Sequence, residues 1–172
     1  MTPTAKRAHT VARDLLSLTR SGEADRLATA LVSTASSTRR APAFGDVVGR
    51  LVDTFSLAAK DRRRSLRIGE PFTLRLRDHA GRTVQPDRLD PGVAAIVRAI
   101  AASVRDDRVT CADQIGEACD NADLDQRIRV LAHCLVWTSD LLSTDTTAYP
   151  PVLSCFKMAS RRVSTVDIAR FG

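Results

Sequence analysis

The chain has 172 residues, of which 44% are hydrophobic and 27% charged, and this composition fits one globular domain with its own core. No apolar run approaches the roughly 20 residues of a membrane-spanning helix, and residues 1–10 lack an apolar signal core, so we expect neither a membrane partner nor export. The net charge of +6 rests on 26 basic residues, only three of them lysines, which suits nucleic-acid phosphates; a GC-rich coding sequence would also favour arginine.

Motifs for catalysis or metal binding are absent from the sequence. The four cysteines form no C-x-x-C pair, and the three histidines do not complete zinc-ligand spacing. Cys119 and Cys134 have apolar neighbours and are interpreted as small core residues. With aromatic residues at 4%, a base-stacking surface is not expected either. We therefore expect no enzymatic activity, no cofactor and no metal.

Three amphipathic helices are expected in the first 64 residues, because apolar residues recur there at helical spacing. The first ends before Ser21-Gly22, the second covers 23–35, and the third covers 44–60 before a charged run. Their inward faces are Ala8, Val11, Leu15 and Leu18; Ala24, Leu27, Ala28 and Leu31; and Val47, Val48, Leu51, Phe55 and Ala58.

A short β-hairpin is expected within residues 66–85, where the hydrophobic period changes. Phe72, Leu74 and Leu76 alternate with polar residues, which is typical of a half-buried strand. The pattern predicts a turn at 78–81 and a short return strand at 82–84. Because a lone hairpin is marginally stable in water, it should pack against the helices.

Two further helices are expected over residues 91–106 and 123–142. Asp90 is a natural N-cap and Pro91 suits the first helical position, while Asp123 can cap the second of these helices. The segment between them is mixed and allows only a short helix over 113–118. After a loop at 143–151 we expect one helical turn at 155–158 and then an exposed tail.

These elements predict a mainly α fold, an antiparallel four-helix bundle with a short β-hairpin and an extra N-terminal helix. We expect one domain over residues 1–172. Residues 1–21 would be an N-terminal extension, and residues 159–172 would be exposed.

One charged grouping is a candidate binding site. Arg105 and Arg108 precede the mixed segment, and Asp123 and Asp125 follow it. If the two flanking helices are antiparallel neighbours, these four side chains converge and can hold a phosphate or ribose. Helix-end salt bridges on a solvated rim are an equally good interpretation.

Taken in this order, the chain resembles the rod-shaped plant-virus coat proteins typified by tobacco mosaic virus, over roughly residues 23–158. That family has two helices, a small sheet region, two more helices and a tail. The strings that carry the resemblance are Thr54-Phe55-Ser56 with Lys60, Leu89-Asp90-Pro91, Arg105, Arg108 and Val109, Asp123 with Ile128-Arg129, and Tyr149 with Phe156.

The resemblance implies a structural capsid protein that self-assembles into helical rods around single-stranded RNA, binding phosphates without sequence specificity. Its partners would be further copies of the chain and RNA, and it would be found in the virion and the host cytoplasm. The expected RNA-binding residues are Arg39, Arg40, Arg105, Arg108, Asp123 and Asp125. The expected subunit contacts are Phe55, Asp90, Tyr149 and Phe156.

The chain also departs from the family pattern. Leu57, Ala58 and Ala59 stand where a carboxylate commonly follows the Phe-Ser string, and the segment between Arg108 and Asp123 is shorter than the usual inner loop. Two alternatives therefore stay open. One is a bacterial nucleic-acid-binding regulator, favoured by the charge and by a helix-turn-helix-like string at 164–170; the other is a protein-interaction bundle without nucleic acid.

Overall fold

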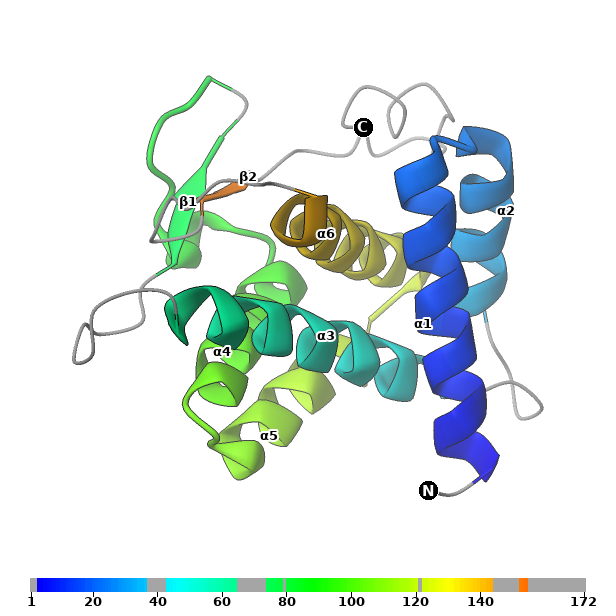
Figure 1. Ribbon diagram of the computed structural model, residues 1–172, viewed down its shortest axis with the longest axis horizontal. Helices are drawn as coiled ribbons and strands as arrows, with labels where there is room; N and C mark the ends of the chain where they lie inside the picture. Colours follow the sequence, from blue (N-terminus) through cyan, green and yellow to red (C-terminus); the bar gives the residue numbers. More distant parts are fainter. Residues whose placement is uncertain are drawn as a thin grey trace.

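The computed structural model describes residues 3–36, 43–64, 74–78, 80–120, 122–143 and 152–154. Within these ranges the chain forms six α-helices, one 3-10 helix and two short strands (Figure 1). The elements are α1 (Pro3–Ser21), α2 (Ala24–Ala35), α3 (Phe44–Arg64), β1 (Arg75–Arg77), η1 (Pro86–Arg88), α4 (Pro91–Val104), α5 (Arg108–Cys119), α6 (Leu124–Ser143) and β2 (Val152–Ser154).

The helices form a bundle, so the predicted mainly α fold is confirmed. Helices α3, α4 and α6 pack against one another, and α5 lies along α4. The α1–α2 pair covers α3 and α6, and α1 runs across the direction of α3 (Figure 1). The first helix, expected as an extension, is part of the core, because Ala8, Ala12 and Leu15 are buried.

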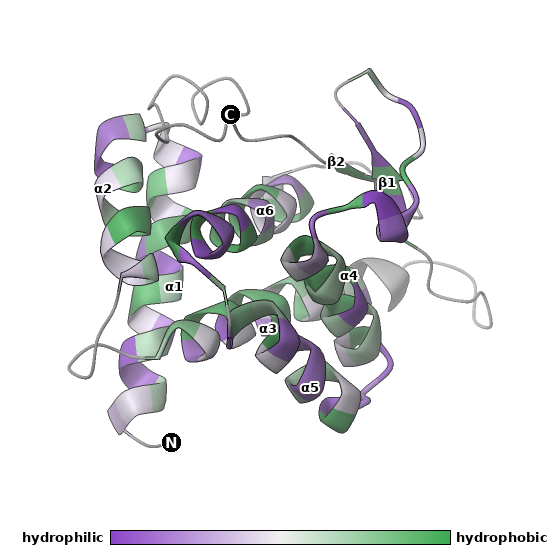
Figure 2. Cartoon of the chain, turned by 180° about the vertical axis from the view of Figure 1, so that it is seen from behind, coloured by the Kyte–Doolittle hydropathy of each residue, from purple (hydrophilic) through white to green (hydrophobic). Residues whose placement is uncertain are grey.

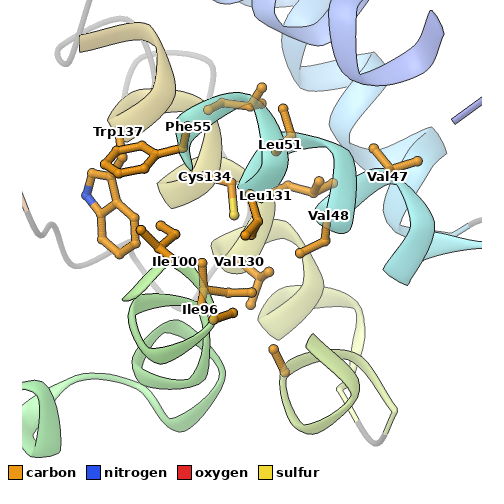
Figure 3. Packing of buried hydrophobic residues seen from close by; sticks show 14 of the residues in the cluster. Val47, Val48, Leu51, Phe55, Ile96, Ile100, Val130, Leu131, Cys134 and Trp137 are labelled. Atoms are coloured by element: carbon orange, nitrogen blue, oxygen red, sulfur yellow. The ribbon is translucent and has the colours of Figure 1, made fainter. Parts of the chain in front are cut away.

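Buried side chains of α3, α4 and α6 make the centre of the core. Phe55 and Trp137 are the largest fully buried side chains among the described residues, and both point into this cluster (Figure 3). Hydrophobic and hydrophilic stretches alternate along the helices, as expected of elements with one buried face (Figure 2). Within the described ranges no helix is long and apolar enough to cross a lipid bilayer.

Side chains stop and start the helices where the sequence predicts. Asp90 caps α4, since its Oδ1 accepts a hydrogen bond from the Gly92 amide at 3.1 Å, and Pro91 takes the first helical position. Asp123 and Gln126 form a reciprocal capping box at α6, at 2.8 and 2.9 Å. Both predicted caps are confirmed.

The sheet differs from the predicted hairpin. Strand β1 pairs in parallel with β2, with Leu76 opposite Leu153, and both leucines are buried. The turn after β1 is present, because the Asp78 amide donates to the Arg82 carbonyl at 2.9 Å, but the return segment contributes only an isolated antiparallel bridge at Thr83. A partner that buries Leu153 stabilises β1 better than the exposed return strand. The predicted strand residue Phe72 and the helical turn at 155–158 lie outside the described residues.

Candidate functional site

The predicted convergence of arginines and aspartates is wrong. Arg105 follows the last residue of α4 and Arg108 is the first residue of α5, whereas Asp123 and Asp125 stand at the start of α6. The mixed segment is not a loop but the 12-residue helix α5, about 18 Å long at 1.5 Å per residue. Because α5 runs back along α4, it places the two pairs at its opposite ends.

Buried residues on one side of α5 explain why it packs on its neighbours. Cys111, Ala118 and Cys119 are buried, and Ile115 lies 3.8 Å from the position of a Cβ on Gly49 of α3. The amphipathic signal of these mostly small residues is weak, which is why the sequence predicted only residues 113–118 here. Cys119 and Cys134 are core residues as predicted, and burial raises the pKa of Cys119 to about 12.

Most other predicted site residues are either buried, engaged within the molecule or outside the described residues. Phe55 is 1% exposed, so its expected role in a subunit contact is wrong: its side chain fills the core. Asp90 caps α4 and pairs with Arg129 at 3.4 Å. The remaining predicted residues, which lie outside the described ranges, are Arg39, Arg40, Tyr149 and Phe156.

Two hollows lie beside α1 and α3. One hollow of about 630 Å³ lies between α1, α3 and the end of α6, where Leu142 lines it. A second hollow of about 820 Å³ lies between α3 and α5. His9 and Thr54 line both hollows, so the two are adjacent. We call them together the α1–α3 groove.

Helix α1 contributes a basic stripe to this groove. His9, Arg13 and Arg20 stand at positions i, i+4 and i+11, which places them within roughly 40° of one another around a helix. All three are exposed. The nearest carboxylate pairing is Arg13 with Asp14 at 3.7 Å between two well-exposed side chains, which contributes little.

The charge of the groove is predominantly positive. Its two carboxylates are already engaged: Asp53 lies 3.4 Å from Arg50, and Asp106 lies 2.6 Å from the Lys60 ammonium. Arg20 and Arg108 form no ion pair with any described residue. The charged side chains that line the groove are the cations Arg13, Arg20, Arg50, Lys60 and Arg108 and the anions Asp53 and Asp106.

The aspartates of the α4–α5 turn are held by neighbouring groups. The Lys60 ammonium, which donates a hydrogen bond to Asp106, lowers the pKa of that carboxyl. Hydrogen bonds from Thr110 lower the pKa of Asp107, whose Oδ1 caps α5. Both groups are therefore anionic at neutral pH and already have cationic or amide partners, while the neighbouring Arg105 and Arg108 side chains are exposed.

Sequence reasoning identified Arg108 and missed most of the other groove cations. The spacing of His9, Arg13 and Arg20 was a readable signal, because one helical face carries them all. The placement of Arg50 and Lys60 opposite α5 could not be read, since α5 itself was not expected as a full helix.

The described residues contain no group of three His, Cys, Asp or Glu side chains that could hold a metal ion. Comparison of the chain with protein-family models, with curated proteins and with solved structures found no match.

Proposed function

We propose that the protein is a non-enzymatic RNA-binding protein that holds single-stranded RNA by its phosphates along the α1–α3 groove. The observation that carries this proposal is the lining of the groove, where five cations face two carboxylates that are already paired. A guanidinium group without a carboxylate partner among the described residues, as at Arg20, is well suited to phosphate oxygens.

The side chains of the groove favour contact with the backbone of RNA over reading of its bases. Among the described residues no Phe, Tyr or Trp side chain lines either hollow, and His9 is the one aromatic ring there, so a strand of successive bases has no row of stacking platforms. Binding by phosphate neutralisation is independent of sequence and falls steeply with salt. The stripe from His9 to Arg20 extends over about 16 Å of α1, enough to follow a strand rather than a single charge.

The resemblance to rod-shaped coat proteins gives a specific form of this proposal, in which RNA-bound subunits polymerise into helical rods. Leu57 and Val109, at 64% and 74% exposure, are the most exposed large hydrophobic side chains of the described residues and could contact a neighbouring subunit. Non-closing head-to-tail contacts generate such helices. Negative-stain electron microscopy with and without RNA tests this form: rods on RNA support it, and a discrete oligomer under every condition contradicts it.

The RNA-binding proposal is tested with charge-matched variants. In one, Arg13→Gln and Arg20→Gln remove two groove cations; in the control, Arg26→Gln and Arg88→Gln remove two exposed cations elsewhere. Affinity for a labelled single-stranded RNA of roughly 20 nucleotides is measured by fluorescence anisotropy across a salt series. We expect the groove variant to bind about tenfold more weakly and to lower the salt slope by roughly 1.4, since each phosphate contact in single strands contributes about 0.7.

The control variant distinguishes binding in the groove from a general effect of lost positive charge. If both variants weaken binding equally, the groove assignment is wrong. A preference for duplex DNA over single-stranded RNA would instead favour the regulator alternative, and absence of affinity for any nucleic acid would favour a protein-interaction bundle.

A further inference from the structure

We propose that the hollow between α3 and α5 is a binding site for a small organic phosphate, of about the size of a nucleoside monophosphate. Such a free ligand would bind whether or not RNA does, although Lys60 and Arg108 serve both. The proposal depends on two features of the hollow: its size with apolar walls, and the cations at one end.

The size and walls of the hollow suit a small ligand. Its volume of about 820 Å³ lies within the range of roughly 300–1,000 Å³ typical of ligand sites. Leu57 from α3 and Ala112 and Ile115 from α5 form apolar walls. A sugar or base could be covered by these side chains, whereas an inorganic ion would leave them unused.

The end of the hollow beside the α4–α5 turn suits a phosphate. Lys60 from α3 and Arg108 from α5 both line it. Asp106 lines the same end: Lys60 lies 2.6 Å from it and the charge of Arg108 acts on it as well, so this end carries two cations and one carboxylate. A phosphate monoester carries nearly two negative charges near neutral pH, so it matches a pair of cations better than a carboxylate does.

The floor of the hollow carries an unexplained polar group. Ser56 is 3% exposed, and its Oγ has no hydrogen-bond partner among the described residues. Ser56 shares one face of α3 with Asp53 and Lys60, each about one turn away. The Ser56 Oγ has less than 1 Å² of accessible surface, so a ligand in the hollow lies over Ser56 without reaching its hydroxyl.

The part of α3 that lines the hollow is about as long as a nucleotide. Asp53 and Lys60 are seven residues apart, about 10 Å along the helix. With the phosphate at Lys60 and Arg108, the sugar would lie beside Ser56 and the far end of the ligand beside the Arg50–Asp53 pair. Asp53 is exposed and its 3.4 Å contact with Arg50 is long, so its carboxylate can still accept hydrogen bonds from ligand hydroxyl or amino groups.

The test is isothermal titration calorimetry of the full chain with AMP, CMP, GMP and UMP in turn, and with inorganic phosphate. We expect each nucleotide to bind with a dissociation constant of about 1 mM or tighter, and inorganic phosphate to bind at least about tenfold more weakly. Ala112→Phe fills the hollow without changing its charge and should weaken nucleotide binding about tenfold or more. Ala112 is exposed, so the variant should fold.

Two further variants complete the design. Ala80→Phe adds the same side chain at an exposed position outside the hollow and should leave nucleotide affinity within about twofold. Ser56→Ala should leave nucleotide affinity within about twofold and the ligand-free melting temperature equal or higher, because it removes an unpartnered hydroxyl that a ligand in the hollow does not reach.

The outcomes for this site and for RNA binding are distinguishable. Absence of binding by all four nucleotides at roughly 10 mM, or equal affinity in wild type and Ala112→Phe, overturns the ligand site. If RNA still binds in that case, the proposed function stands without it. If nucleotides bind as expected but RNA does not, the proposed function fails and the ligand site stands.

Discussion

The two faces of α3 differ in burial, so stability can be tested on one face and the proposed binding on the other. On the inward face Val47, Leu51 and Phe55 are at most 1% exposed and meet α4 and α6 in the core (Figure 3). On the groove face Leu57 is exposed and Arg50 is partly exposed, and both line the hollow between α3 and α5. One helix can therefore lose groove side chains without losing its place in the bundle, which makes the groove open to mutational analysis.

The largest expected effect is on the inward face. Phe55→Ala should lower the free energy of unfolding by about 3–5 kcal/mol, because it removes a fully buried ring and leaves a cavity. Urea unfolding followed by far-UV circular dichroism measures this change. Leu57→Ala, two residues away at 64% exposure, should change it by less than about 0.5 kcal/mol.

This pair also decides between the core position of Phe55 and the subunit-contact role expected from the sequence. If Phe55→Ala left the monomer as stable as Leu57→Ala does and only reduced association, the inward position of the ring would be wrong. A normal stability loss with no specific change in association agrees with the core assignment.

The sequence predicted best where strong local signals agree. The Asp90-Pro91 start and the wide apolar stripe placed α4 at 91–106, against the observed Pro91–Val104. The start of α3 at Phe44 was predicted in the same way, whereas its end at Arg64 lies beyond the predicted residue 60. Helix α5 was predicted only in its second half, because Val109 is 74% exposed and the buried residues are mostly small. The full length of α5 depends on its packing against α4, and a short stretch of sequence does not contain that information.

Longer-range contacts explain the other differences. The partner of β1 lies about 75 residues further along the chain, whereas local pattern favoured the adjacent return segment. The α1–α3 groove could be predicted only in part: the basic stripe of α1 is visible in the sequence, but the crossing of α1 over α3 brings it opposite Thr54. Arg108 was predicted to lie beside Asp123 and Asp125, but these two aspartates stand at the other end of α5.

A smaller effect is expected at the start of α4, away from the groove. Asp90→Ala should lower the free energy of unfolding by about 1–2 kcal/mol, because it removes the N-cap and the partner of Arg129. Asp90→Asn keeps a capping oxygen and loses only the charge, so it should cost less than about 1 kcal/mol. Both are measured by thermal and urea unfolding.

The two Asp90 variants also sharpen the contrast between fold and groove. RNA affinity should be unchanged in both at a temperature where they are folded, because Asp90 does not line the groove. A loss of RNA affinity equal to that of the Arg13→Gln and Arg20→Gln variant would mean that the binding surface extends to the far end of α4.

The smallest effect is expected at the mouth of the groove, where Lys60 and Asp106 pair across two elements. The Lys60 ammonium lowers the folded-state pKa of Asp106 from its ordinary value near 3.8, so the pair stabilises the fold above that pH. The contribution is lost as the pH falls through the lowered folded-state pKa, where the carboxyl becomes protonated in both states. A double-mutant cycle of Asp106→Asn and Lys60→Gln, measured by urea midpoints from roughly pH 7 to pH 2, should show a small favourable coupling that disappears on acidification. Coupling that persists at the lowest pH would show that the contact between Lys60 and Asp106 does not depend on the ionised carboxylate.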